Sequence, residues 1–136
     1  MIQAVVGGKG TGKTKTLVNM ANKALEEAKG EIVFISAERR RMIELNHRIR
    51  LIRLREFDIK DLEVFYGFLN GIIAQNYDIE RIYIDGLLEF LDEDITSIGD
   101  FLKDINRISK QFNIKFVISM NGDPNSVPTF LKEYIA

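Results

Sequence analysis

The sequence predicts an α/β fold in which helices cover both faces of a mostly parallel sheet. Four short segments are continuously apolar or nearly so, as expected for strands buried on both faces: residues 2–6, 32–35, 82–84 and 116–118. Between them, apolar residues recur every three or four positions, which is typical of amphipathic helices. Strands that alternate with such helices form right-handed crossover units, so we expect a parallel sheet.

Three helices are expected, over residues 17–28, 62–73 and 98–112. Residue types that satisfy unpaired backbone groups mark their ends. Gly30 follows the first helix, Asp58 precedes the second, and either Thr96 or Ser97 precedes the third.

A fifth strand is expected over residues 49–54. This run contains Ile and Leu but no Pro, and it follows a short helical segment that we expect after Glu38. A short last helix is expected with Pro128 in its first turn, because proline is well tolerated at that position.

Composition limits the class of protein. The chain has 136 residues, and we expect residues 1–136 to form a single domain with one core. With 46% hydrophobic and 29% charged residues, it is typical of a globular chain rather than a disordered one. The net charge of −1 provides no overall attraction to nucleic acid or to an anionic membrane. The lack of Cys excludes disulfides, thiolate metal sites and cysteine nucleophiles.

The apolar segments are too short for a membrane span of about 20 residues. The chain also runs from Met1 directly into a short strand, without the basic and long apolar regions of a signal peptide. We therefore expect a cytoplasmic protein with no membrane partner.

The strongest motif lies between the first strand and the first helix. It has the P-loop pattern Gly-x-x-x-x-Gly-Lys-Thr, as Gly7-Gly8-Lys9-Gly10-Thr11-Gly12-Lys13-Thr14. In such a loop the glycines let consecutive N–H groups point at a phosphate, and the helix that follows adds its positive dipole end. The candidate nucleotide-binding residues are Gly8, Lys9, Gly10, Thr11, Gly12, Lys13, Thr14 and Lys15.

A P-loop works with Mg²⁺, which the Thr14 hydroxyl would help to hold. Asp85 ends the buried strand at residues 82–84, at the edge of the sheet where ligand sites of α/β proteins gather. Asp85 is therefore the candidate Walker B residue and second metal partner. The simpler alternative is that Asp85 begins the turn that Gly86 continues.

Three further segments resemble the nucleotide site of the RecA-like ATPases: Phe34-Ile35-Ser36-Ala37-Glu38, Tyr83-Ile84-Asp85-Gly86 and Val117-Ile118-Ser119-Met120-Asn121. This resemblance implies that Glu38 is the general base, that Asp85 binds Mg²⁺ and that Asn121 senses the γ-phosphate. It also implies the sheet order 3-2-4-5-1, with the sensor strand between the P-loop strand and the Walker B strand. The alternative for Glu38 is a solvated residue that opens a helix.

The chain also departs from that family. The sensor of the family is usually Gln, where this chain has Asn121, and larger members continue for several strands beyond it. A shortened sheet leaves the P-loop strand at an edge, which a partner or the C-terminal segment would have to cover.

Other P-loop groups fit less well. The ParA and MinD-like ATPases carry a lysine where this chain has Gly8, and AAA+ proteins carry a glutamate where it has Gly86. Small-molecule kinases, with compact glycine-rich loops, remain the main alternative, and a nucleotide-dependent assembly or regulatory module is the third.

Seven arginines cluster around the fifth strand: Arg39, Arg40, Arg41, Arg48, Arg50, Arg53 and Arg55. They would suit a phosphosubstrate, a nucleic acid or a neighbouring subunit. We favour instead a charged guard on an edge strand, because no aromatic residues that would stack on bases lie among them. The single histidine, His47, lies among these arginines and is expected at the surface.

Together these features predict an ATP-binding protein that hydrolyses ATP with Mg²⁺. Lys13 and Glu38 are the candidate catalytic residues, Thr14 and Asp85 the metal partners, and Asn121 an additional nucleotide contact. A second copy of the chain or another protein is the partner that we consider besides ATP. No sequence feature distinguishes ATP from GTP.

Overall fold

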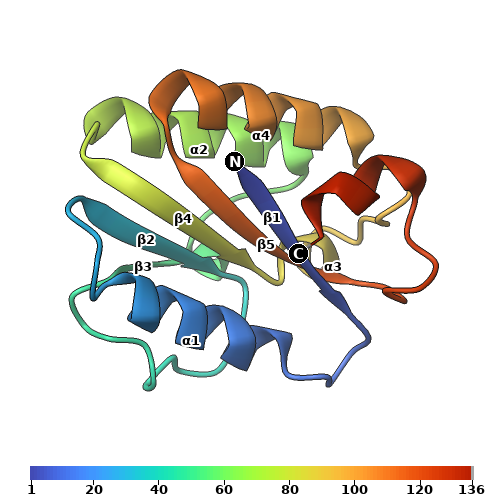
Figure 1. Ribbon diagram of the computed structural model, residues 1–136, viewed down its shortest axis with the longest axis horizontal. Helices are drawn as coiled ribbons and strands as arrows, with labels where there is room; N and C mark the ends of the chain where they lie inside the picture. Colours follow the sequence, from blue (N-terminus) through green and yellow to red (C-terminus); the bar gives the residue numbers. More distant parts are fainter. Residues whose placement is uncertain (136) are drawn as a thin grey trace.

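The structure is a computed structural model that describes residues 1–135, and it confirms the α/β fold (Figure 1). The five strands are β1 (Ile2–Gly7), β2 (Glu31–Ser36), β3 (Arg50–Arg53), β4 (Ile79–Asp85) and β5 (Lys115–Asn121). The α-helices are α1 (Lys13–Ala24), α2 (Leu62–Gln75), α3 (Leu87–Phe90) and α4 (Gly99–Phe112), and two short 3₁₀ helices are η1 (Leu54–Glu56) and η2 (Thr129–Tyr134). No helix within residues 1–135 is both long and apolar enough to cross a bilayer.

The sheet has the expected order, β3-β2-β4-β5-β1, and all of its strand pairs are parallel. Helix α1 covers one face, and α2 and α4 cover the other, so the domain has three layers (Figure 1). Because side chains alternate along a strand, Tyr83 of β4 packs toward α1 while Ile82 and Ile84 pack toward α2 and α4. Tyr83 stacks on Phe34 of β2, with ring centroids 6.0 Å apart.

The three expected helices are present, but none of the residues expected to cap their ends does so. Helix α2 is capped by Asp61, whose side chain accepts a hydrogen bond from the Val64 amide at 2.8 Å, and not by Asp58. Helix α4 follows Ile98 and has no side-chain cap. Thr96 and Ser97 bond to Asp94 instead, so they stabilise the turn before the helix.

Two other expectations near α1 and β2 were wrong. Helix α1 ends at Ala24, so Gly30 does not cap it; a Cβ on Gly30 would collide with the Asp78 carbonyl, so this glycine allows two chain segments to approach closely. The segment after Glu38 forms turns rather than a short helix. Its backbone carbonyls accept hydrogen bonds from Arg53 of the next strand, which competes with helix formation.

Strand β1, which carries the P-loop motif, lies at one edge of the sheet. The C-terminal segment covers this edge, which is one of the two alternatives that the sequence left open. Helix η2, directly after Pro128, lies beside β1 (Figure 1), with Leu131 fully buried. Ile135 then forms a parallel bridge with Ala4. The other edge is β3, the arginine-rich strand.

Candidate functional site

The phosphate loop curls between buried β1 and helix α1. Gly10 and Gly12 have φ angles of 79° and 86°, which are left-handed conformations that favour glycine, and Gly12 immediately precedes α1. A Cβ on Gly7 would lie 2.7 Å from Oγ1 of Thr11, so that side chain would have to move. The backbone path itself therefore favours glycine at positions 10 and 12.

Side chains of the loop close it on itself. Thr11 donates from its hydroxyl to the Gly8 carbonyl at 2.7 Å, and the Lys13 ammonium donates to the same carbonyl at 2.8 Å. Lys13 thus lies over the concave side of the loop, with its charge held at the start of the helix. This arrangement places a cation and a helix N-terminus at one point, which is suited to a phosphate group.

The Thr14 hydroxyl joins this loop to two acidic residues from neighbouring strands. Its oxygen lies 2.9 Å from Oδ2 of Asp85 and 3.0 Å from Oε1 of Glu38, so its single hydrogen can be donated to either carboxylate. Asp85 ends β4, and Glu38 lies just beyond β2, next to β4 in the sheet. Parallel strands that end at the same edge of the sheet bring these sequence-distant side chains together.

Asp85 is buried, with 3% of its surface exposed, and burial raises its pKa. Hydrogen bonds from Ser119 and Thr14 lower the pKa of Asp85, whereas the nearby charge of Glu38 raises it. The Ser119 hydroxyl donates to Oδ1 of Asp85 at 2.8 Å and accepts from the Gly86 amide at 3.1 Å. The carboxylate is therefore fixed on both of its oxygens.

Glu38 is half-buried, and its own amide donates to the Ser36 hydroxyl at 3.1 Å. The residue before it, Ala37, donates its amide to the Asp85 carbonyl at 3.0 Å. The segment that carries Glu38 is thus bonded to the strand that carries Asp85, so the spacing between the two carboxylates is set by the backbone.

These residues surround a hollow of about 410 Å³. Its lining consists of Lys9, Gly10, Gly12, Lys13, Thr14, Lys15, Glu38, Arg40, Asp85, Gly86, Glu89 and Ser119. Most of the candidate residues from the sequence are brought together here. Gly8 and Thr11 instead stabilise the loop from within, as described above.

Asn121 lies at the end of β5 and does not line this hollow. Its side-chain amide donates to the carboxylate of Glu89, which does. Two residues earlier on the same face of β5, Ser119 reaches Asp85 directly. The role of Asn121 as a phosphate sensor stays a prediction.

Sequence reasoning missed four residues of the lining: Arg40, Gly86, Glu89 and Ser119. Ser119 belongs to the segment of residues 117–121 that resembles the RecA-like ATPases. Its position near the end of a strand next to β4 was the signal that could have identified it. Glu89 is the fourth residue after Asp85, one helical turn along α3. The sequence alone did not distinguish Arg40 from the six other arginines of the cluster.

The site fits Mg²⁺ only together with a ligand that supplies more oxygens. Thr14 and Asp85 offer the hard oxygen donors that Mg²⁺ prefers. Within residues 1–135, no group of three or more His, Asp or Glu side chains is close enough to hold an ion. Phosphate oxygens would complete such a coordination shell.

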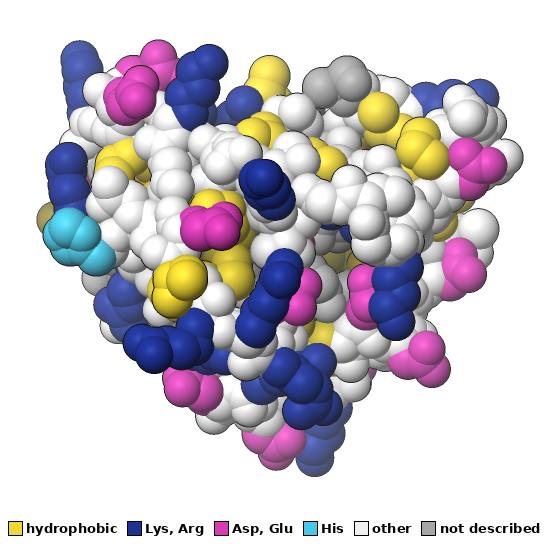
Figure 2. Space-filling model, turned by 90° about the horizontal axis from the view of Figure 1, so that it is seen from below, with side chains coloured by type: hydrophobic (Ala, Val, Ile, Leu, Met, Phe, Trp, Pro, Cys, Tyr) yellow, Lys and Arg dark blue, Asp and Glu magenta, His cyan; other side chains and the backbone are white. Residues whose placement is uncertain are grey.

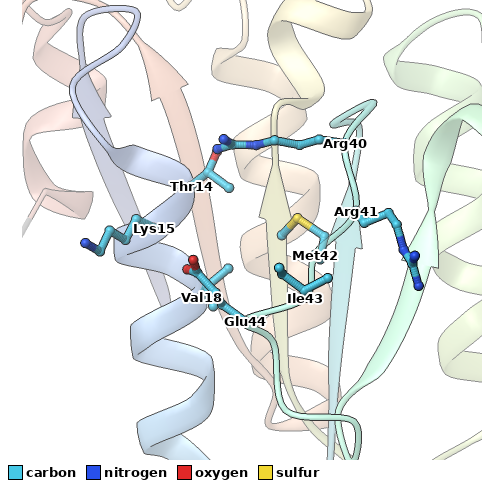
Figure 3. A pocket seen from close by; sticks show the side chains of 8 residues that line it. All are labelled: Thr14, Lys15, Val18, Arg40, Arg41, Met42, Ile43 and Glu44. Carbon is cyan, nitrogen blue, oxygen red and sulfur yellow. The ribbon is translucent and has the colours of Figure 1, made fainter.

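A second pocket, of about 320 Å³, adjoins the hollow beside α1 (Figure 3). The two cavities share Thr14, Lys15 and Arg40. Figure 3 shows Val18 of α1 facing Met42 and Ile43 of the following loop, with Glu44 between the helix and the loop. Asn22 of α1 fixes this loop, since it donates to the Glu44 carbonyl and accepts from the Asn46 amide, both at 2.8 Å.

The surface around α1 is rich in basic side chains. Figure 2 shows Lys and Arg distributed over this face, with fewer Asp and Glu between them and the single histidine, His47, exposed at one margin. Arg53 and Arg55 differ from the other arginines of the cluster, because both donate to backbone carbonyls. Arg55 donates to Ala37, and Arg53 donates to Glu38 and Arg39. The arginine cluster thus contains structural members as well as exposed ones.

Comparison with known proteins identifies the fold. No protein-family model matches this sequence, and no curated protein sequence matches it. Among solved structures, a KaiC-like protein from the hyperthermophilic archaeon Pyrococcus horikoshii OT3 is similar, with a TM-score of 0.65 and 17% sequence identity. The match covers 95% of this chain but 64% of that one. The fold is RecA-like. The P-loop motif, the sheet order and this likeness agree on that architecture.

Proposed function

We propose that this chain binds ATP together with Mg²⁺ in the hollow and hydrolyses it. The observation that carries the proposal is the Thr14 hydroxyl, which lies at the start of a P-loop helix and within hydrogen-bond distance of both Asp85 and Glu38. A glycine-rich turn with no ligand role would not need two half-buried or buried carboxylates at its mouth, since these cost free energy to bury.

The loop and Lys13 would bind the phosphates. Amides at the start of α1 and the Lys13 ammonium would stabilise the negative charge that shifts toward the leaving phosphate in the transition state. Thr14 and Asp85 would hold Mg²⁺, which, when bound, neutralises phosphate charge and fixes phosphate geometry. Ser119 would keep Asp85 oriented toward the ion.

Glu38 would orient and deprotonate the attacking water. Its carboxylate lies on the side of Thr14 where the outermost phosphate would lie, and it lines the hollow. Positioned general bases contribute about 10² to 10⁴ in rate.

We also propose that residues 1–136 form a single nucleotide-binding domain. Cytoplasmic location and partnership with a second copy or another protein stay predictions.

The test is a titration with Mg·ATP followed by measurement of phosphate release. We expect Lys13→Ala to abolish binding, while Lys23→Ala, an exposed lysine at the other end of α1, leaves binding unchanged. Glu38→Gln is expected to retain binding, and its rate of phosphate release should fall at least about 10²-fold. Binding that is unaffected by Lys13→Ala would refute the proposal. Transfer only to an added acceptor would indicate a kinase, and binding without turnover a nucleotide-dependent module.

A further inference from the structure

Arg40 is the one member of the arginine cluster that lines the hollow. It also lines the adjoining pocket, and Figure 3 shows its side chain extending from the loop toward Thr14, whereas Arg41 points away. The guanidinium of Arg40 therefore faces the junction between the two cavities.

The Arg40 side chain has no partner among residues 1–135. Arg81 and Arg107 pair with carboxylates, and Arg53 and Arg55 donate to carbonyls. Arg40 forms neither an ion pair nor a side-chain hydrogen bond with another described residue. Its five N–H donors thus remain available at the hollow, in a planar arrangement that matches phosphate oxygens.

The backbone under Arg40 is held in place by Arg53 of the edge strand β3. One guanidinium donates to three successive carbonyls: to Glu38 at 3.3 Å, to Arg39 at 3.0 Å and to Arg40 at 3.4 Å. The turn that carries both Glu38 and Arg40 is therefore fixed to the sheet by a side chain that lies outside the hollow.

We propose that Arg40 binds the terminal phosphate of a nucleoside triphosphate within its own chain, and that Arg53 is the residue that positions it. Arg40 and Glu38 lie two residues apart on this turn, and both line the hollow beside Thr14, where the proposed function would place the outermost phosphate. A diphosphate lacks that group, so Arg40 distinguishes triphosphate from diphosphate. The inference rests on the proposed function, because it assumes that the P-loop binds nucleotide.

The first test compares the affinities of ATPγS and ADP, each with Mg²⁺, by calorimetry. We expect Arg40→Ala to weaken ATPγS binding about tenfold and ADP binding less than about twofold, the usual scale for losing one charge-assisted bond. Arg40→Lys should fall between, because lysine keeps the charge but not the planar donors. Arg39→Ala, an exposed neighbour outside the hollow, is the control and should change neither affinity.

Equal weakening of ATPγS and ADP by Arg40→Ala, or an unchanged ATPγS affinity, would overturn this inference and leave the proposed function standing. Lys13→Ala distinguishes the proposed function from the inference about Arg40, since it should weaken the binding of both ATPγS and ADP. If the unaltered chain bound neither nucleotide, the proposed function and this inference would both be refuted.

The second test concerns Arg53. Arg53→Ala should reduce the preference for ATPγS over ADP nearly as much as Arg40→Ala does, and Arg53→Lys should restore part of it. Arg50→Ala, on the same strand and exposed, is the control. A lower melting temperature for Arg53→Ala with an unchanged preference would show that Arg53 is merely structural, and would overturn its positioning role.

Discussion

Replacing Ser119 by Ala should destabilise the domain because this hydroxyl supports the buried Asp85. It donates to the Asp85 carboxylate at 2.8 Å and accepts from the Gly86 amide at 3.1 Å. A bond to a carboxylate contributes about 2 kcal/mol and one between neutral groups about 1 kcal/mol, so we expect a loss of about 3 kcal/mol at neutral pH. A chain of 136 residues has an unfolding entropy of about 0.3 kcal/mol/K, so the melting temperature should fall by about 10 °C.

The larger part of this loss should depend on pH. Burial raises the pKa of Asp85, and the Ser119 bond lowers it again, so without the bond the pKa of Asp85 rises further. The bond to the carboxylate therefore stabilises the fold when Asp85 is ionised, and its contribution is lost as the pH falls through the raised pKa. The hydrogen bond from the Gly86 amide to Ser119 stabilises the fold both above and below the pKa of Asp85.

The assay is urea unfolding of the unaltered chain and the variant between pH 7 and pH 4. Ser36→Ala is the matched control, because Ser36 is also buried but its hydroxyl accepts from the Glu38 amide and bonds to no carboxylate within residues 1–135. Its cost should be nearly constant over this range. The reasoning is refuted if Ser119→Ala costs no more than Ser36→Ala at pH 7, or if its cost does not decrease as the pH falls.

Three further predictions concern stability. Asp61→Ala should lower the free energy of unfolding in urea by about 1 kcal/mol and Asp58→Ala by less than about 0.5 kcal/mol, since only Asp61 caps α2; equal effects would contradict this assignment. Asp85→Asn should raise the melting temperature at pH 7 by removing a buried charge, and should abolish Mg²⁺-dependent phosphate release. The gain in melting temperature should disappear as the pH falls through the raised pKa of Asp85. A lower melting temperature at pH 7 would contradict this prediction. Leu131→Ala should cost about 2 to 5 kcal/mol in the same urea assay, and a cost below about 1 kcal/mol would show that the C-terminal segment is not firmly packed on β1.

The sequence was sufficient to predict the fold because the strands are short apolar runs without competing patterns. Residues 82–84, for example, are buried on both faces of the sheet, as a central parallel strand requires. Helix ends were harder to predict, since Asp58 and Asp61 are the same residue type three positions apart. Only the backbone conformation decides which of them can reach a free amide.

The loop after β1 is recognisable from the sequence because local geometry favours glycine at positions 10 and 12, whereas the rest of the candidate site depends on neighbours in the sheet. Ser119 reaches Asp85 only because β5 lies beside β4, and a single serine in an apolar strand carries no local signal of this. The role of Arg53 likewise depends on contacts with a segment some 14 residues away, which composition cannot reveal. Such contacts also replaced the helix that we expected after Glu38.

The Thr14 hydroxyl carries one hydrogen, yet two carboxylates lie within reach of it. One of these acceptors is therefore always without that donor, and the two carboxylates lie close to each other. Such crowding of acidic groups lowers the free energy of unfolding. Binding of Mg²⁺ and phosphates there, as proposed, would relieve it and would gain affinity from that relief.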